Sequence, residues 1–164
     1  MKKTLLTLSA LALMATATPA LAALDETEIS VIDMKPSEFA RDFNRLNKAN
    51  GQAFKPIKLS NTYGEQRVNL APNIYMLVGA HTDAIEYIDY ICNKPALTSK
   101  KCMVAMPWIG SAVDPNFNQV SFMLMVGRNL DINTTVSYQQ NDVEYHFIPD
   151  KKKNQIRLEI KIID

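Results

Sequence analysis

VEYHFIPDKKKNQIRLEIKI, residues 143–162, is the stretch that predicts the fold most firmly. Apolar and polar side chains alternate over residues 143–147 and again over 156–162, and a turn rich in lysine separates the two runs. A period of two is typical of strands with one buried face and one solvated face. The stretch therefore predicts an antiparallel β-hairpin.

Two more strands are expected directly upstream. Residues 120–126 are nearly all apolar, which is typical of a buried central strand, and residues 130–138 return to alternation after a bend at Gly127. With the C-terminal hairpin, these segments predict a four-strand antiparallel meander that is apolar on one face.

A first amphipathic helix is expected over residues 36–49. Pro36 suits the first turn of a helix, and Gly51 follows the segment where a helix stop is needed. Its apolar side chains recur at steps of four and three residues, at Phe39, Phe43 and Leu46. Such a stripe is expected to pack on a core.

A second amphipathic helix is expected over residues 82–93. Thr82 or Asp83 would cap it, and Pro95 would end it. The apolar stripe consists of Ile85, Ile88, Ile91 and Cys92. Two helices over the apolar face of the meander make a two-layer α+β domain.

The N-terminus has the three parts of a secretory signal peptide. Two lysines precede an uncharged apolar run over residues 4–17, and small residues at Ala20 and Ala22 suit a signal peptidase. The run is shorter than the roughly 20 residues that span a bilayer. We expect cleavage after Ala22, a periplasmic or secreted product without a membrane anchor, and one domain over residues 23–164.

The charge balance gives no reason to expect that the chain binds a polyanion. The chain of 164 residues has 18 basic and 17 acidic side chains, and cleavage would remove two of the lysines. A nearly neutral domain gives no reason to expect nucleic acid as a partner.

The two cysteines are expected to form one disulfide. Cys92 and Cys102 are ten positions apart, and an oxidising compartment favours their pairing. A redox pair is usually two residues apart and a structural zinc site needs four ligands, so the sequence predicts neither a metal nor a cofactor.

No catalytic set is predicted. His81 and His146 are the two histidines, and Ser111 lacks the glycine pattern of a nucleophile elbow. Acidic residues at helical spacing, Asp83, Glu86 and Asp89, are interpreted as a solvated helix face. An enzyme that uses His81 with carboxylates is kept only as a third hypothesis.

Aromatic residues flank the segment between Cys92 and Cys102, and basic residues lie within it. Such mixtures are common at protein-binding surfaces, although Trp108 and one tyrosine could equally belong to the core. The candidate partner-binding residues are Tyr87, Tyr90, Lys94, Lys100, Lys101 and Trp108.

These observations predict an exported, non-catalytic protein-binding domain, such as an inhibitor, an immunity protein or an accessory subunit of envelope machinery. Its expected partner is another envelope or secreted protein. The alternative is a carrier of a small hydrophobic ligand, with a pocket between helices and sheet that adaptable methionines would line. Those methionines are Met76, Met103, Met106, Met123 and Met125.

Overall fold

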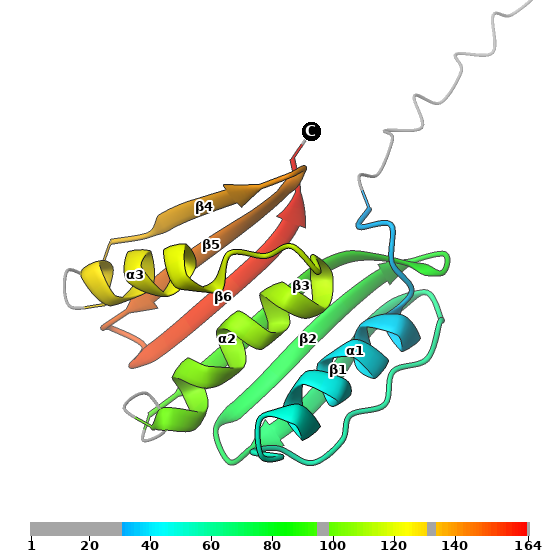
Figure 1. Ribbon diagram of the computed structural model, residues 1–164, viewed down its shortest axis with the longest axis horizontal. Helices are drawn as coiled ribbons and strands as arrows, with labels where there is room; N and C mark the ends of the chain where they lie inside the picture. The colour runs from blue at the N-terminus through cyan, green and yellow to red at the C-terminus, as the bar shows by residue number, and fades with distance from the viewer. Residues whose placement is uncertain (1–30, 95–98, 131–133, 164) are drawn as a thin grey trace, which may run out of the picture.

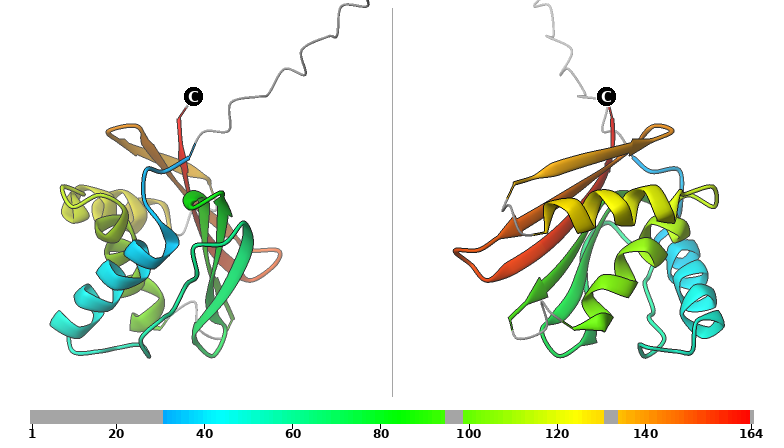
Figure 2. Two further views of the ribbon diagram at one scale, coloured as in Figure 1. Left: turned by 90° about the vertical axis from the view of Figure 1, so that its right-hand side faces the viewer. Right: turned by 60° about the vertical axis from the view of Figure 1, so that its left-hand side comes forward.

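Three helices lie on one face of a six-stranded antiparallel sheet in the computed structural model, which describes residues 31–94, 99–130 and 134–163. Figure 2 shows the two layers edge-on, with the helices on one side of the sheet and no helix on the other. The predicted α+β class is confirmed. The predicted signal peptide, residues 1–22, lies outside the described residues. Within them, no helix has both the length and the apolar character to cross a membrane.

The sheet consists of two three-stranded meanders joined side by side. The strands follow the order β1-β2-β3-β6-β5-β4, so β3 and β6 make the junction. Their bounds are β1 Gly64–Ala71, β2 Ile74–His81, β3 Ala84–Asn93, β4 Val136–Gln140, β5 Val143–Asp150 and β6 Gln155–Ile162. The sheet therefore has six strands where the sequence predicted four.

The C-terminal hairpin is confirmed. β5 pairs with β6 from Val143 opposite Ile162 to Asp150 opposite Gln155, and the apolar positions of both strands face the helices. Strand β4 begins at Val136, so Leu130 and residues 134 and 135 of the expected strand 130–138 are not in the sheet, and residues 131–133 lie outside the described part.

Helix α1, Pro36–Ala49, has the predicted bounds. The carboxylate of Glu38 accepts a hydrogen bond from the backbone N–H of Lys35 at 3.1 Å, which satisfies one of the free donors at the helix start. Phe39 and Phe43 are fully buried. Local signals of helix start, stripe and stop agree here with the tertiary packing, which is why the prediction succeeds.

The helix predicted over residues 82–93 is wrong, because this segment is strand β3. A β-bulge between β2 and β3 leaves Glu86 as an extra residue, since Ile85 pairs with Ala80 and Tyr87 pairs with Gly79. The extra residue lengthens the inward-facing step between Ile85 and Ile88 from two positions to three. A bulged strand therefore imitates the helical spacing on which the prediction depended.

The strand predicted over residues 120–126 is also wrong, because helix α3 occupies Gln119–Asn129. The side chain of Asn118 caps this helix by accepting from the backbone N–H of Ser121 at 3.0 Å. Phe122 and Val126, one helical turn apart, are fully buried. A short apolar run has no clear period, so the sequence could not distinguish a helix from a buried strand here.

Helix α2, Lys100–Val113, occupies a segment that the sequence analysis did not assign to any helix. Ser99 caps it, and Pro107 lies within it. Its buried face packs on the sheet, and the ring of Phe117 lies against Gly110 so closely that a Cβ there would be 2.5 Å from a ring carbon. Proline and glycine are common helix breakers, and here tertiary packing outweighs that preference.

Candidate functional site

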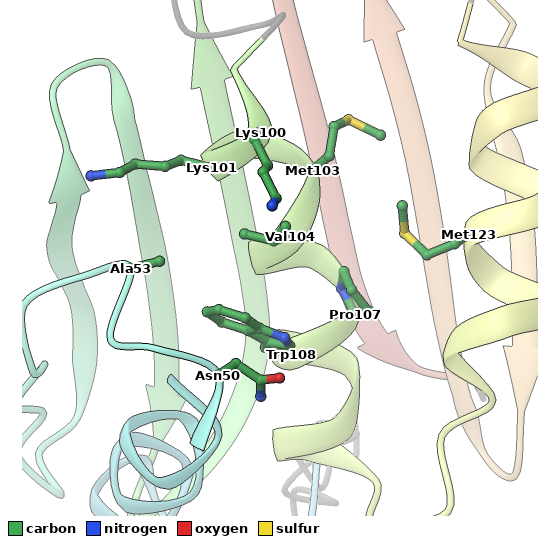
Figure 3. Close-up of a pocket in the computed structure, with 9 residues that line it drawn as sticks. All are labelled: Asn50, Ala53, Lys100, Lys101, Met103, Val104, Pro107, Trp108 and Met123. Carbon is green, nitrogen blue, oxygen red and sulfur yellow. The ribbon is translucent and has the colours of Figure 1, made fainter. Parts of the chain in front are cut away.

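A groove lies on the outer side of the helix layer and has helix α2 as its floor. It has a volume of about 670 Å³. We call this hollow the α2 groove. It is lined by Asn50, Ala53, Lys100, Lys101, Met103, Val104, Pro107, Trp108 and Met123. Figure 3 shows them arranged over α2, with Asn50 and Ala53 on one side and Met123 of α3 on the other.

The disulfide fixes the lysine-bearing end of the groove. Cys92 at the end of β3 is bonded to Cys102 in the first turn of α2, with their Cα atoms 6.1 Å apart. Both cysteines are fully buried. The predicted disulfide is therefore present, and it ties Lys100 and Lys101 to the sheet.

Two asparagines on α1 fix the opposite rim. Asn47 is buried, and its amide group donates to the carbonyl of Phe54 at 2.8 Å and accepts from the N–H of Phe54 at 3.1 Å. Asn44 holds Ile57 through the same pair of bonds, each 2.8 Å long. These bonds hold the loop after α1 along the helix, so Ala53 stays at the groove.

Trp108 is mainly a core residue with one edge in the groove. Trp108 is only 8% exposed, and its ring packs edge-on against the ring of Phe54 at a centroid distance of 6.0 Å. The interpretation of Trp108 as a core residue is therefore confirmed, and its exposed edge also lines the groove.

The charge of the groove has one sign. Lys100 and Lys101 are exposed, and the N-terminal end of α2 adds the positive end of its helix dipole beside them. A second hollow of about 480 Å³ shares Ala53 and Lys101 with the groove and adds Lys55. Among the described residues that line these two hollows, there is no carboxylate.

Other candidate residues lie away from the groove. Tyr90 is buried, where its hydroxyl donates to the carbonyl of Cys102 at 2.9 Å, and burial raises the pKa of this phenol. Lys94 is exposed at the end of β3, where its backbone N–H donates to Asn154 in the β5–β6 turn. Neither lines the α2 groove.

Tyr87 lies on the sheet face that no described helix covers. Its hydroxyl donates to Glu65 across β2 at 2.6 Å, and this bond, with burial and nearby carboxylates, raises the pKa of Tyr87 to about 12. The structure thus brings together Lys100, Lys101 and Trp108, and separates from them Tyr87, Tyr90 and Lys94. Sequence reasoning missed Asn50, Ala53, Val104 and Pro107, and it named Met103 and Met123 only for the carrier alternative.

A serine, a histidine and a glutamate also meet on the uncovered face. Ser137 Oγ is 2.9 Å from Nδ1 of His146, and Nε2 of His146 is 2.8 Å from a carboxylate oxygen of Glu144. All three project from adjacent positions of β4 and β5, where the backbone is paired in the sheet. The two hollows described above do not include these three residues.

The residues of the third hypothesis, His81 and the acidic series, make separate contacts. His81 ends β2 and packs edge-on against the ring of Tyr63 at a centroid distance of 5.6 Å. Asp83 pairs with Lys35 and Asp89 with Arg157, so the acidic series that was predicted on one helix face is divided among different contacts. In the described part of the chain, no three potential metal ligands are grouped.

Comparison of the chain with protein-family models, with curated proteins and with solved structures finds no match. We therefore infer the function from the geometry of the site.

Proposed function

We propose that the chain is an exported, non-catalytic protein-binding domain, such as an inhibitor, an immunity protein or an accessory subunit of envelope machinery, and that the α2 groove binds an acidic partner. The observation that carries this proposal is the convergence of Lys100, Lys101 and Trp108 around a groove whose other lining is largely apolar. Aromatic and basic side chains at a partly desolvated hollow are the usual anchors of a protein interface.

The surface around the groove supports the same function. Helices α2 and α3 contain no acidic residue. On α3, Val120 is 71% exposed and Leu124 is 56% exposed, one turn apart. An exposed apolar pair beside an apolar groove is a feature of interaction surfaces.

Helix α1 offers the contrast. Its solvent side has charges of both signs, and Asp42 pairs with Arg41 and Arg45 within the helix. Those charges already have partners in the chain. The lysines of the groove have no ion-pair partner among the described residues, so their positive charge is available to a partner.

Export is part of the proposal. The disulfide supports an oxidising compartment, because such bonds rarely persist in the cytosol. The N-terminal pattern supports a cleaved signal peptide and a periplasmic address.

The carrier alternative would use the same groove rather than a pocket between helices and sheet. Met76 and Met106 are fully buried in the packed core, whereas Met103 and Met123 line the groove. A small amphipathic anion would pair with the same lysines. Identifying the captured molecule as a protein or as a small molecule therefore distinguishes the two functions.

We expect the variant Lys100→Glu/Lys101→Glu to capture at least about tenfold less partner from envelope extracts, because two attractive charges become repulsive. The proteins and small molecules that the immobilised domain retains are measured by quantitative mass spectrometry. Retention is compared at about 50 mM and about 300 mM salt, because attraction between surface charges is screened increasingly over this range. Capture by the wild type should weaken at the higher salt.

The matched control is Lys58→Glu/Lys152→Glu, which makes the same change of charge at exposed lysines outside the groove. Its capture should stay within about twofold of the wild type, since a rim-distant charge acts weakly through solvent. Equal capture by both variants would contradict the proposed site. A retained lipid or other small anion without a protein would favour the carrier alternative.

A further inference from the structure

Lysines from four separate segments gather at one end of the sheet. The backbone N–H of Lys94 donates to the carbonyl of Asn154 in the β5–β6 turn at 3.0 Å, and the disulfide ties the start of α2 to the end of β3. Lys55 and Lys101 line one hollow together with the β1–β2 turn. In Figure 1 these turns and the start of α2 follow one another around the lower left side of the molecule. We call this group the lysine end, and its members are Lys55, Lys94, Lys100, Lys101, Lys151, Lys152 and Lys153.

The lysine end has little compensating negative charge. All of its lysines are exposed. In the described segments that carry them, residues 50–55, 93–94, 99–104 and 150–154, the only carboxylate is that of Asp150, which pairs with Lys153 at 3.8 Å. The turns at the opposite ends of the strands, β2–β3 and β4–β5, carry Asp83 and Asp142 and no lysine. The nearly neutral charge of the whole chain therefore conceals one strongly basic end.

The arrangement of these lysines suits an extended anionic surface better than one small anion. They project from turns and from the start of a helix, and only Lys55, Lys100 and Lys101 line a hollow. The group contains no arginine, whose planar fork grips a single phosphate or carboxylate through two hydrogen bonds. A lysine is a hydrated point charge on a flexible stem, and clusters of such charges attract bilayers that contain anionic lipids. The positive end of the α2 dipole adds to the same field.

We propose that the lysine end binds the surface of an anionic phospholipid bilayer by electrostatic attraction. Each lysine near such a surface raises the partition coefficient about fivefold, so several weak contacts together give reversible binding. The inference goes beyond the proposed function, because Lys94 and the lysines of the β5–β6 turn do not line the α2 groove.

Co-sedimentation with vesicles measures the partition coefficient of the exported, oxidised chain. One set of vesicles is phosphatidylcholine alone, and the other contains about 40% phosphatidylglycerol, which makes the surface anionic. We expect binding to the anionic vesicles at about 50 mM salt and binding at least about tenfold weaker at about 300 mM, because salt screens surface charge. The neutral vesicles should not bind the chain.

The turn variant, Lys151→Gln/Lys152→Gln/Lys153→Gln, removes charge from the lysine end without touching the groove. We expect its partition coefficient on anionic vesicles to fall at least about twentyfold, since each lost lysine contributes up to about fivefold. The replaced side chains are exposed in the β5–β6 turn, so the core is unchanged.

The matched control variant is Arg45→Gln/Lys58→Gln/Lys161→Gln. It makes the same change of net charge at exposed positions outside the lysine end. Its partition coefficient should stay within about threefold of the wild type, because charges held away from the bilayer are screened by solvent.

Paramagnetic lipid in the same vesicles reports which end of the domain faces the bilayer. With a paramagnetic headgroup lipid and ¹⁵N-labelled chain, we expect the amide signals of Lys101 and Asn154 to broaden first. The signals of Thr82 and Asn141, in the turns at the opposite ends of the strands, should broaden last.

Several results would overturn the proposal. They are equal binding to neutral and anionic vesicles, equal losses in the turn and control variants, and broadening that begins at Thr82. Displacement from vesicles by monomeric dihexanoyl-phosphatidylglycerol would replace the bilayer surface by a site for one headgroup. A turn variant that binds vesicles normally but captures less protein would assign the lysine end to an acidic protein.

Failure here is distinguishable from failure of the proposed function. A chain that does not bind anionic vesicles and yet depends on Lys100 and Lys101 for partner capture would refute bilayer binding alone.

Discussion

Replacing both cysteines in Cys92→Ala/Cys102→Ala is expected to lower the free energy of unfolding by about 3 kcal/mol. The bond closes a loop with a sequence separation of 10 residues. In the chain-entropy model a loop of about this size restricts the unfolded chain by roughly that amount. The midpoint of thermal unfolding should fall by about 10 °C.

Urea unfolding of the oxidised wild type, the reduced wild type and the alanine variant would measure this loss. The reduced wild type keeps both buried sulfur atoms, so it separates the crosslink from the packing. Amide exchange of residues 100–104 should accelerate in both disulfide-free forms, because the bond holds the first turn of α2. Equal midpoints for the oxidised and reduced chains would show that the bond contributes nothing to stability.

The second large effect is expected for Arg157→Leu. Asp89 accepts two hydrogen bonds from Arg157, at 2.9 Å and 2.8 Å, and is only 7% exposed although it lies on the uncovered face of the sheet. Removing the guanidinium leaves a buried carboxylate without its counter-charge. We expect the free energy of unfolding at pH 7 to fall by about 3 kcal/mol.

The loss should depend on pH, and its sign follows from burial. Burial raises the pKa of the Asp89 carboxyl, although Arg157 opposes this shift and Glu159 adds to it. Without Arg157 that pKa rises further. A group whose folded-state pKa exceeds its unfolded-state pKa stabilises the fold most when protonated, and this contribution is lost as pH rises through the folded-state pKa. The variant should therefore recover part of its stability relative to the wild type when pH is lowered toward about 4.

Urea unfolding of the wild type, Arg157→Leu and Asp89→Asn/Arg157→Leu at pH 7 and at acidic pH would measure this effect. The double variant lacks the buried charge, so its stability difference from the wild type should be smaller at pH 7 than that of the single variant. A loss of equal size at both pH values in the single variant would assign the role of Arg157 to packing.

The parts of the fold that could be predicted are those where one local signal agrees with the packing. The sequence of helix α1 contains a helix start signal, an apolar stripe and a helix stop signal. The β5–β6 hairpin alternates apolar and polar residues with a clear period of two on both sides of a polar turn. Strand β3 and helix α3 could not be predicted. In β3 a bulge disguises the period, and in α3 continuous apolar residues leave no period to detect.

The candidate site was predictable to the extent that it is local. Lys100, Lys101 and Trp108 lie within nine consecutive positions, and one helix carries them all. The contributions of Asn50 and Met123 depend on tertiary packing, which brings the end of α1 and the side of α3 to α2. Tyr87 and Tyr90 were grouped with them in sequence, but strand geometry sends Tyr87 to the uncovered face and Tyr90 into the core.

Site-specific photo-crosslinking in cells tests the central claim most directly. A photoreactive phenylalanine derivative is placed at Met123 in the groove and, in a separate chain, at Gln139 on the uncovered sheet. We predict a partner adduct from position 123 that disappears when Lys100→Glu/Lys101→Glu is added. An adduct from position 139 with none from position 123 would contradict the account.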